Sequence, residues 1–261
     1  MKVFNVCLIA LLLGNFSISQ AQVSSKIKDA LGKLGTTTTD TSKSTTTSSS
    51  AAASSITSTE ANNALKQALS NGLQASIKSL SVQDGYLGDA VVKILMPAEA
   101  QKVEKALRAV GMGSLCDQFI TSMNRAAETA VSEAGTVFVN SLSKMSIQDA
   151  SAILLSNQQN AATTYFKTNT NTELTSKFTP VIESAMGKNN VSTYWGQLTT
   201  AYNKLPLSSK VDTDLTSYVT QKAIDGLFVK VADQELKIRE NLGGARSTEL
   251  LSKVFGWVDN Q

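Results

Sequence analysis

The sequence predicts an all-α protein with a single multi-helix, bundle-like domain of about nine helices. Beyond Glu60, apolar residues recur at three- and four-residue steps over long stretches, which is the spacing of one helix face. At most one short segment, near Ala90 to Leu95 (AVVKIL), has strand-like composition. About two hundred residues carry the helical pattern, which is enough for one domain with a sizeable core.

Residues 1–21 (MKVFNVCLIALLLGNFSISQA) have the pattern of a secretory signal peptide. An apolar run from Val3 to Leu13 is followed by a small-x-small cleavage site that ends at Ala21. The run of about eleven residues is too short for a bilayer, which needs about twenty. We therefore expect cleavage after Ala21, no lipid on Cys7, and export to the periplasm or cell envelope. The alternative is an N-terminal anchor helix.

Residues 22–59 precede the predicted domain. Residues 22–34 form a short N-terminal segment, in which VSSKIKDALGKL favours an amphipathic helix. Residues 35–59 (GTTTTDTSKSTTTSSSAAASSITST) are nearly all Thr, Ser and Ala, and they offer little to bury. Such a tract cannot offset the entropy cost of ordering, so it predicts a disordered linker. The helical domain then spans residues 60–261.

The first helix is predicted from Glu60 to Leu80, where the apolar positions lie on one face: Ala64, Leu65, Ala68, Leu69, Leu73, Ile77 and Leu80. Asp84-Gly85 marks a turn. Pro97 suits the first position of a second helix, and Gly111 suits its end.

The longest predicted helix runs from Leu115 to Met145. Its core face is the set Phe119, Met123, Ala126, Ala130, Ala134, Val137 and Ser141. Ser146-Ile-Gln-Asp149 then resembles a capping box, which predicts the start of a short helix through Leu155.

The remaining helices are bounded by Pro, Gly and capping residues. Pro180 is interpreted as a helix start, Pro206 as a break, and Gly243-Gly244 as a hinge between the last two helices. The predicted ranges are Gln158 to Lys167, Pro180 to Met186, Ser192 to Lys204, Thr213 to Glu240 and Thr248 to Val258.

The composition excludes several kinds of site. The sequence contains no His, which excludes a Ser-His-Asp triad, a Cys-His dyad and His-ligated zinc or copper. Signal cleavage removes Cys7 and leaves Cys116 alone, so no internal disulfide is expected. The formal charge is only +3, and no basic run with interleaved aromatics indicates nucleic-acid binding. No catalytic residue, metal ligand or cofactor is predicted.

Arg125 and Glu128 lie on the polar face of the longest predicted helix, three residues apart. A helix of this length is expected to be covered on more than one side, and charges covered in that way must be paired. The predicted partners are Glu235, Arg239, Glu240 and Arg246, in a network that holds the C-terminal segment. The alternatives are a solvent-exposed pair and a binding or catalytic site.

The helix from Thr213 to Glu240 has apolar residues around most of its circumference, which predicts a central helix packed on several sides. Gly226 lies inside it, where Gly costs about 1 kcal/mol relative to Ala. We expect a close helix crossing at Gly226, with ligand approach as the alternative. Asp225 needs a hydrogen-bond donor if it is buried. Glu235 and Arg239 lie four residues apart in the favoured order for an ion pair.

Several strings, in this order and spacing, carry a resemblance to a known family: DGYLGDAVVKI, NRAAE, KMSIQDASAIL, AATTYF, LTSKFTPVIESA, YVTQKAIDGLFVKVADQELKIRE and ARSTELLSKVFG. From Glu60 to Gly256 the protein resembles the bacterial family catalogued as domain of unknown function 4197. The resemblance implies an exported, mainly helical domain, and it supplies no catalytic residues. The candidate residues Arg125, Glu128, Asp225, Arg239 and Arg246 lie within the matching strings.

Three functions fit this sequence. The first is an exported domain that binds an envelope protein or a small ligand without turnover, because no set of catalytic residues can be recognised in the sequence. The second is a carrier of lipid or another apolar ligand, since helical bundles can hold cavities. The third is a hydrolase that uses two carboxylates drawn from Glu128, Asp225 and Glu235. After signal removal, no transmembrane segment is predicted.

Overall fold

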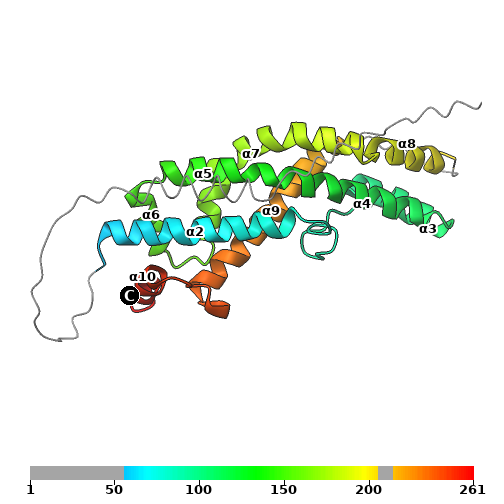
Figure 1. The fold of residues 1–261 in the computed structure, drawn as a ribbon. Helices are drawn as coiled ribbons and strands as arrows, with labels where there is room; N and C mark the ends of the chain where they lie inside the picture. The colour runs from blue at the N-terminus through cyan, green and yellow to red at the C-terminus, as the bar shows by residue number, and fades with distance from the viewer. Residues whose placement is uncertain (1–55, 205–213) are drawn as a thin grey trace, which may run out of the picture.

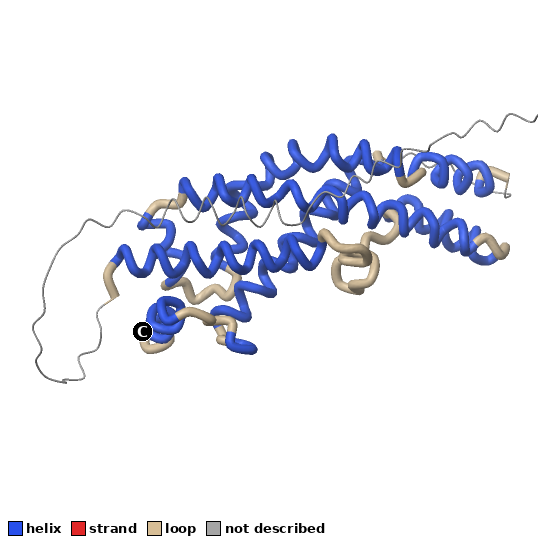
Figure 2. The backbone as a smooth tube through the Cα atoms, in the orientation of Figure 1, coloured by secondary structure: helices blue, strands red, loops and turns tan. Residues whose placement is uncertain are grey.

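The computed structural model describes residues 56–204 and 214–261, and every regular element in these residues is helical (Figures 1 and 2). This confirms the predicted all-α class. The α-helices are α2 (Ser58–Leu80), α3 (Gln101–Ala109), α4 (Gly113–Ala130), α5 (Ala134–Lys144), α6 (Ile147–Leu154), α7 (Ala161–Lys188), α8 (Val191–Tyr202), α9 (Leu215–Arg239) and α10 (Glu249–Val258). Three short 3-10 turns join them: η1 (Ala98–Ala100), η2 (Val131–Glu133) and η3 (Leu242–Gly244).

The helices form an elongated bundle around α9 (Figure 1). Helix α2, the α4–α5 pair and α7 run along the bundle, and α9 crosses it and contacts α2, α4 and α7. Helices α3 and α8 pack together at one end, whereas α6 and α10 pack against α2 at the other. The prediction of a central helix packed on several sides is therefore confirmed. None of the helices in the described ranges combines the length and apolar character needed to cross a bilayer.

Helix α2 begins at Ser58, two residues before Glu60. Thr57 caps it, because its hydroxyl accepts the main-chain N–H of Glu60 (3.1 Å) while the Glu60 carboxylate accepts that of Thr57 (3.0 Å). The Glu60 carboxylate also lies 2.6 Å from Nζ of Lys253 on α10. The first and last helices of the described domain are thus joined. The predicted signal peptide, the N-terminal segment and the linker up to residue 55 lie outside the described residues.

The predicted helix from Leu115 to Met145 is interrupted by the 3-10 turn η2, so its description as one α-helix was wrong. Residues three apart eclipse one another in a 3-10 turn, so Val131 and Ala134, both fully buried, face the core together. The predicted core face is confirmed, since all seven of its residues are buried. The capping box at Ser146 and the short helix α6 are also confirmed.

Pro180 does not start a helix, contrary to the prediction, because α7 continues through it. An internal Pro removes a main-chain donor and costs about 3 kcal/mol. Phe178 and Ile182, on either side of it, are fully buried. Burying two such side chains contributes about 1.5–3 kcal/mol each, enough to offset the lost hydrogen bond. The predicted break at Pro206 lies outside the described residues.

The segment from Ala90 to Leu95 is not a strand. It nevertheless alternates, because Val92, Ile94 and Met96 are buried whereas the residues between them are exposed. This alternation produced the strand-like pattern in the sequence. The segment belongs to a long connection, residues 81–97, which we call the α2–η1 loop.

Candidate functional site

The α2–η1 loop lies beside α4 and α9, and side chains from both helices hold its backbone. Glu128 of α4 makes the first anchor. Its Oε1 accepts the main-chain N–H groups of Tyr86 (3.2 Å) and Leu87 (3.3 Å), and its side chain is only 6% exposed. A carboxylate that accepts main-chain N–H groups in a buried place holds that stretch of backbone in one conformation.

Arg125 extends this anchor to the start of the loop. Its guanidinium lies 2.6 Å from Oε2 of Glu128 and 2.7 Å from Oδ1 of Asp84. Asp84 has a φ of 65°, in the left-handed region that Asp tolerates better than most residues. Arg125 therefore balances the buried carboxylate and fixes the tight turn at Asp84-Gly85.

The predicted partners of this pair were wrong. Arg125 and Glu128 are covered and paired as expected, but their partners are Asp84 and the loop backbone. The predicted partners Glu235, Arg239 and Arg246 lie in a separate cluster, and Glu240 accepts a hydrogen bond from Gln159 (3.1 Å). The reason is that a loop covers the polar face of α4, and helical periodicity says nothing about where a loop lies.

Tyr86 is the second anchor of the loop. It is completely buried, and its hydroxyl donates to the backbone carbonyl of Ala223 on α9 (2.6 Å). A Cβ at Gly226 would lie 2.7 Å from Cε1 of Tyr86, so the aromatic ring occupies the space of a side chain. The predicted helix crossing at Gly226 was therefore wrong, because a loop tyrosine makes the close approach. Burial, together with the nearby charge of Glu128, raises the pKa of Tyr86 and keeps its hydroxyl protonated.

Three further contacts hold the second half of the loop. The side-chain amide of Asn124 on α4 pairs with both main-chain groups of Ile94. From α9, the Tyr218 hydroxyl donates to the backbone carbonyl of Leu95 (3.0 Å), and Nζ of Lys230 lies 2.5 Å from Asp89. The hydrogen bonds from Lys230 and the main-chain N–H of Val91 lower the pKa of Asp89.

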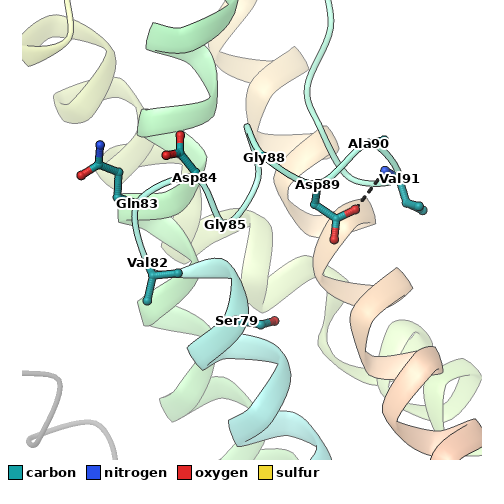
Figure 3. Close-up of a pocket in the computed structure, with 9 residues that line it drawn as sticks. All are labelled: Ser79, Val82, Gln83, Asp84, Gly85, Gly88, Asp89, Ala90 and Val91. Atoms are coloured by element: carbon teal, nitrogen blue, oxygen red, sulfur yellow. Dashed lines mark hydrogen bonds between the residues drawn. The ribbon is translucent and has the colours of Figure 1, made fainter.

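The outer surface of the loop is hollowed and carries apolar side chains. Figure 3 shows the hollow, of about 530 Å³, between the two arms of the loop and the end of α2. Its lining residues are Ser79, Val82, Gln83, Asp84, Gly85, Gly88, Asp89, Ala90 and Val91. Val82 is 39% exposed, Val91 73% and Leu95 56%. The loop therefore combines a fixed backbone with an exposed apolar surface.

A second polar cluster lies where α9 ends. Glu235 accepts the main-chain N–H groups of Ala162 (2.9 Å) and Thr163 (2.8 Å), and so caps the first turn of α7 from another helix. Arg239 bonds to Glu235 (2.9 Å) and to the backbone carbonyl of Ile153 (2.9 Å), which confirms the predicted pair. This cluster joins α6, α7 and α9.

Arg246 completes the second cluster. Its guanidinium donates to the backbone carbonyls of Ile238 (2.9 Å) and Arg239 at the end of α9, and it pairs with Asp259 just beyond α10. A cation that bonds the last carbonyls of a helix also interacts favourably with the helix dipole. Gly243 and Gly244, with φ of 62° and 73°, make the tight turn that returns the backbone to this position.

Asp225 belongs to neither cluster. Its side chain is 41% exposed, accepts a hydrogen bond from Gln221 (3.1 Å) and lies 3.8 Å from Lys167. The three candidate carboxylates thus have separate partners, and those of Glu128 and Glu235 are engaged by main-chain N–H groups. The chemical role of Glu128 and Glu235 is therefore to hold segments of the backbone in place through hydrogen bonds.

Sequence reasoning did not identify Tyr86, Asn124 and Asp89 as residues that hold the α2–η1 loop. The one signal in the sequence was Asn124, a polar residue among the apolar residues of a predicted helix. A buried side-chain amide requires hydrogen-bond partners. The signal does not identify which loop provides them.

No curated protein and no solved structure matches this sequence. One family model matches residues 55–256, most of the sequence, and its description is "Protein of unknown function (DUF4197)". The strings that carried the resemblance meet in space: DGYLGDAVVKI, NRAAE and the first part of α9 form the loop cluster, while the end of α9 meets AATTYF, KMSIQDASAIL and ARSTELLSKVFG. The protein belongs to the DUF4197 family.

Proposed function

We propose that this protein is an exported, cell-envelope domain that binds a partner protein through the α2–η1 loop, without turnover. The observation that carries the proposal is a loop whose backbone is held from two helices while Val82, Val91 and Leu95 face outward. These apolar side chains form no part of the core, so they are available to a partner.

The anchoring of the loop supports binding in particular. Ordering the backbone of a loop costs about 1–2 kcal/mol per residue, and a loop that orders only on binding must meet that cost from the affinity. In this protein the contacts of Glu128, Tyr86 and Asn124 already order the loop backbone before any partner binds. Because the loop is already ordered, less of the binding free energy is spent on ordering it, and the affinity for a partner is higher.

The positions of the acids favour binding over hydrolysis. Acid/base catalysis by two carboxylates requires both to face one substrate bond. Glu128 and Glu235 instead bind main-chain N–H groups in separate clusters, and Asp225 lies on an exposed face of α9.

Export is the other part of the proposal, and it rests on the signal-peptide pattern of residues 1–21. The mature protein is expected to begin near Gln22 and to carry no acyl group. Intact-mass measurement of the protein from envelope and secreted fractions tests this. A mass that includes residues 1–21 would contradict export by cleavage.

Photo-crosslinking in the native envelope tests the partner. A photoreactive amino acid placed at Val91 or Leu95 should give the same defined adduct with one protein, because both side chains face outward from one loop. The matched control places it at Thr172, an exposed residue of α7. Absence of an adduct from both loop positions, or an identical adduct from Thr172, would overturn the proposal.

A further inference from the structure

We infer that the segment of the partner that docks on the α2–η1 loop carries a Lys or Arg side chain, which enters the hollow between residues 79 and 91. The inference rests on the proposed function and specifies the chemistry of the partner. Three observations lead to it: the charge around the hollow, the mixture of groups that line it, and an unused carboxylate oxygen.

The first observation is an excess of negative charge. Arg125 and Lys230, the two cations that pair with the lining carboxylates of Asp84 and Asp89, are each shared with a second carboxylate. Arg125 lies between Asp84 (2.7 Å) and Glu128 (2.6 Å).

Lys230 is shared in the same way, between Asp89 (2.5 Å) and Asp233 (3.8 Å). These two ion-pair groups together contain two cations and four carboxylates, a net charge of −2 within the groups. Such a site attracts a cation and disfavours an anion.

The lining of the hollow has the composition that a long cationic side chain requires. Val82, Ala90 and Val91 provide apolar surface, whereas Asp84 and Asp89 provide carboxylates, and no Lys or Arg is among the lining residues. Lys and Arg bury their methylene stems on apolar surface and keep the charged end beside polar groups. The volume of about 530 Å³ is ample for one such side chain.

One carboxylate still has capacity to bind. Asp84 uses Oδ1 for Arg125, and within the described residues no donor reaches its Oδ2. Its side chain is 53% exposed. The left-handed backbone at Asp84 is held by the loop anchors, so the free oxygen is fixed in place for an incoming N–H.

A charge series at position 91 tests the inference. Val91 is the most exposed apolar side chain of the loop, and its main-chain N–H bond to Asp89 survives any substitution except Pro. The three variants Val91→Gln, Val91→Glu and Val91→Lys all remove the same apolar contact and differ mainly in charge. Each is combined with a photoreactive residue at Leu95, and the yield of the adduct is measured in isolated envelopes at low and high ionic strength.

With a cationic docking segment, the adduct yield should follow the order Glu above Gln above Lys. An exposed charge pair changes binding by roughly 1.5- to 5-fold per step, and the differences should shrink at high salt. Mass spectrometry of the linked peptide should find Lys or Arg beside the crosslinked position.

The outcomes separate this inference from the proposed function. The reverse order, equal yields for the three variants, or a linked peptide without Lys or Arg would overturn the cationic segment and leave partner binding intact. No adduct from either Leu95 or Val91 in the otherwise unaltered protein would overturn the proposed function itself.

Discussion

The side-chain amide of Asn124 pairs with the backbone of Ile94 as a neighbouring strand would. Its Oδ1 accepts the N–H of Ile94 (2.9 Å), and its Nδ2 donates to the carbonyl of the same residue (2.8 Å). One helical side chain thus satisfies both main-chain groups of an extended, buried residue. This is why the segment keeps the burial pattern of a strand without belonging to a sheet.

Replacing Asn124 by Leu, which has a similar shape, should destabilise the protein by about 2–4 kcal/mol, because two buried main-chain groups of Ile94 lose their partners. Urea denaturation measures the loss, and amide exchange at Ile94 should quicken. Asn169→Leu on the exposed side of α7 is the control and should change stability little. Equal denaturation midpoints for the two variants would refute the role given to Asn124.

The Asp84–Arg125–Glu128 cluster should show a graded response. Glu128→Ala should cost about 3–5 kcal/mol, since it leaves two buried main-chain donors without a partner and Arg125 with Asp84 alone. Arg125→Ala should cost less, about 1–3 kcal/mol, because Glu128 keeps its main-chain partners. Asp84→Asn, at a largely exposed end of the cluster, should cost under about 1 kcal/mol. Chemical denaturation of the three variants decides the order, and an Arg125→Ala midpoint equal to the parent's would exclude the cluster as a stabilising element.

Gly226→Ala should be destabilising even though Ala favours helices. The new methyl group would lie 2.7 Å from the Tyr86 ring, and such overpacking costs about 1–3 kcal/mol, against a gain in helix propensity of about 1 kcal/mol. Gly196→Ala in α8 is the matched control, since nothing lies within 4 Å of its added Cβ, and it should be stabilising. The two melting temperatures should therefore move in opposite directions.

Arg246→Lys should loosen the C-terminal helix nearly as much as Arg246→Ala does. A single ammonium group cannot reproduce the fork that reaches Ile238, Arg239 and Asp259 together. We expect a loss of about 2–4 kcal/mol from these charge-assisted bonds, and faster amide exchange in α10 than in α4. Arg108→Ala, which removes two ion pairs at a site where Arg108 itself is 40% exposed, provides the comparison. Full rescue by Lys would show that charge alone accounts for the role of Arg246.

Glu60 should couple stability to acidic pH. The hydrogen bonds from Lys253 and Thr57 lower its pKa from 4.5 to about 2. Because the folded pKa is the lower one, the stabilisation is complete above about pH 4.5 and is lost as the pH falls towards 2. Glu60→Gln should therefore be less stable than the parent at neutral pH and equal to it near pH 2. NMR titration of the Glu60 carboxyl checks the pKa directly, and Lys253→Met should raise it towards 4.5.

Local signals in the sequence predicted much of the fold. The start of α6 at Ser146 and that of α10 at Thr248 depend on capping residues within one turn, so they could be identified from short stretches. The core face of α4 and α5 followed from periodicity alone. Pro180 misled the prediction because burial of Phe178 and Ile182 by other helices outweighs a local preference.

The candidate site was only partly predictable for the same reason. Arg125 and Glu128 could be selected, and their need for partners followed from the cost of burying charge. Their partners lie about forty residues earlier in the sequence, in a loop without periodicity. Placing that loop required the contacts of Tyr86 with α9, which no spacing in the sequence encodes.

The contact between Glu60 and Lys253 distinguishes the two ends of α2. It gathers the first turn of α2 and helix α10 at one end, whereas the α2–η1 loop follows the other end of α2. With 23 residues, α2 is a rigid spacer of about 34 Å. The N-terminal end of α2 therefore lies at the end of the molecule that α10 closes, and the α2–η1 loop lies at a fixed distance of about one helix length from it.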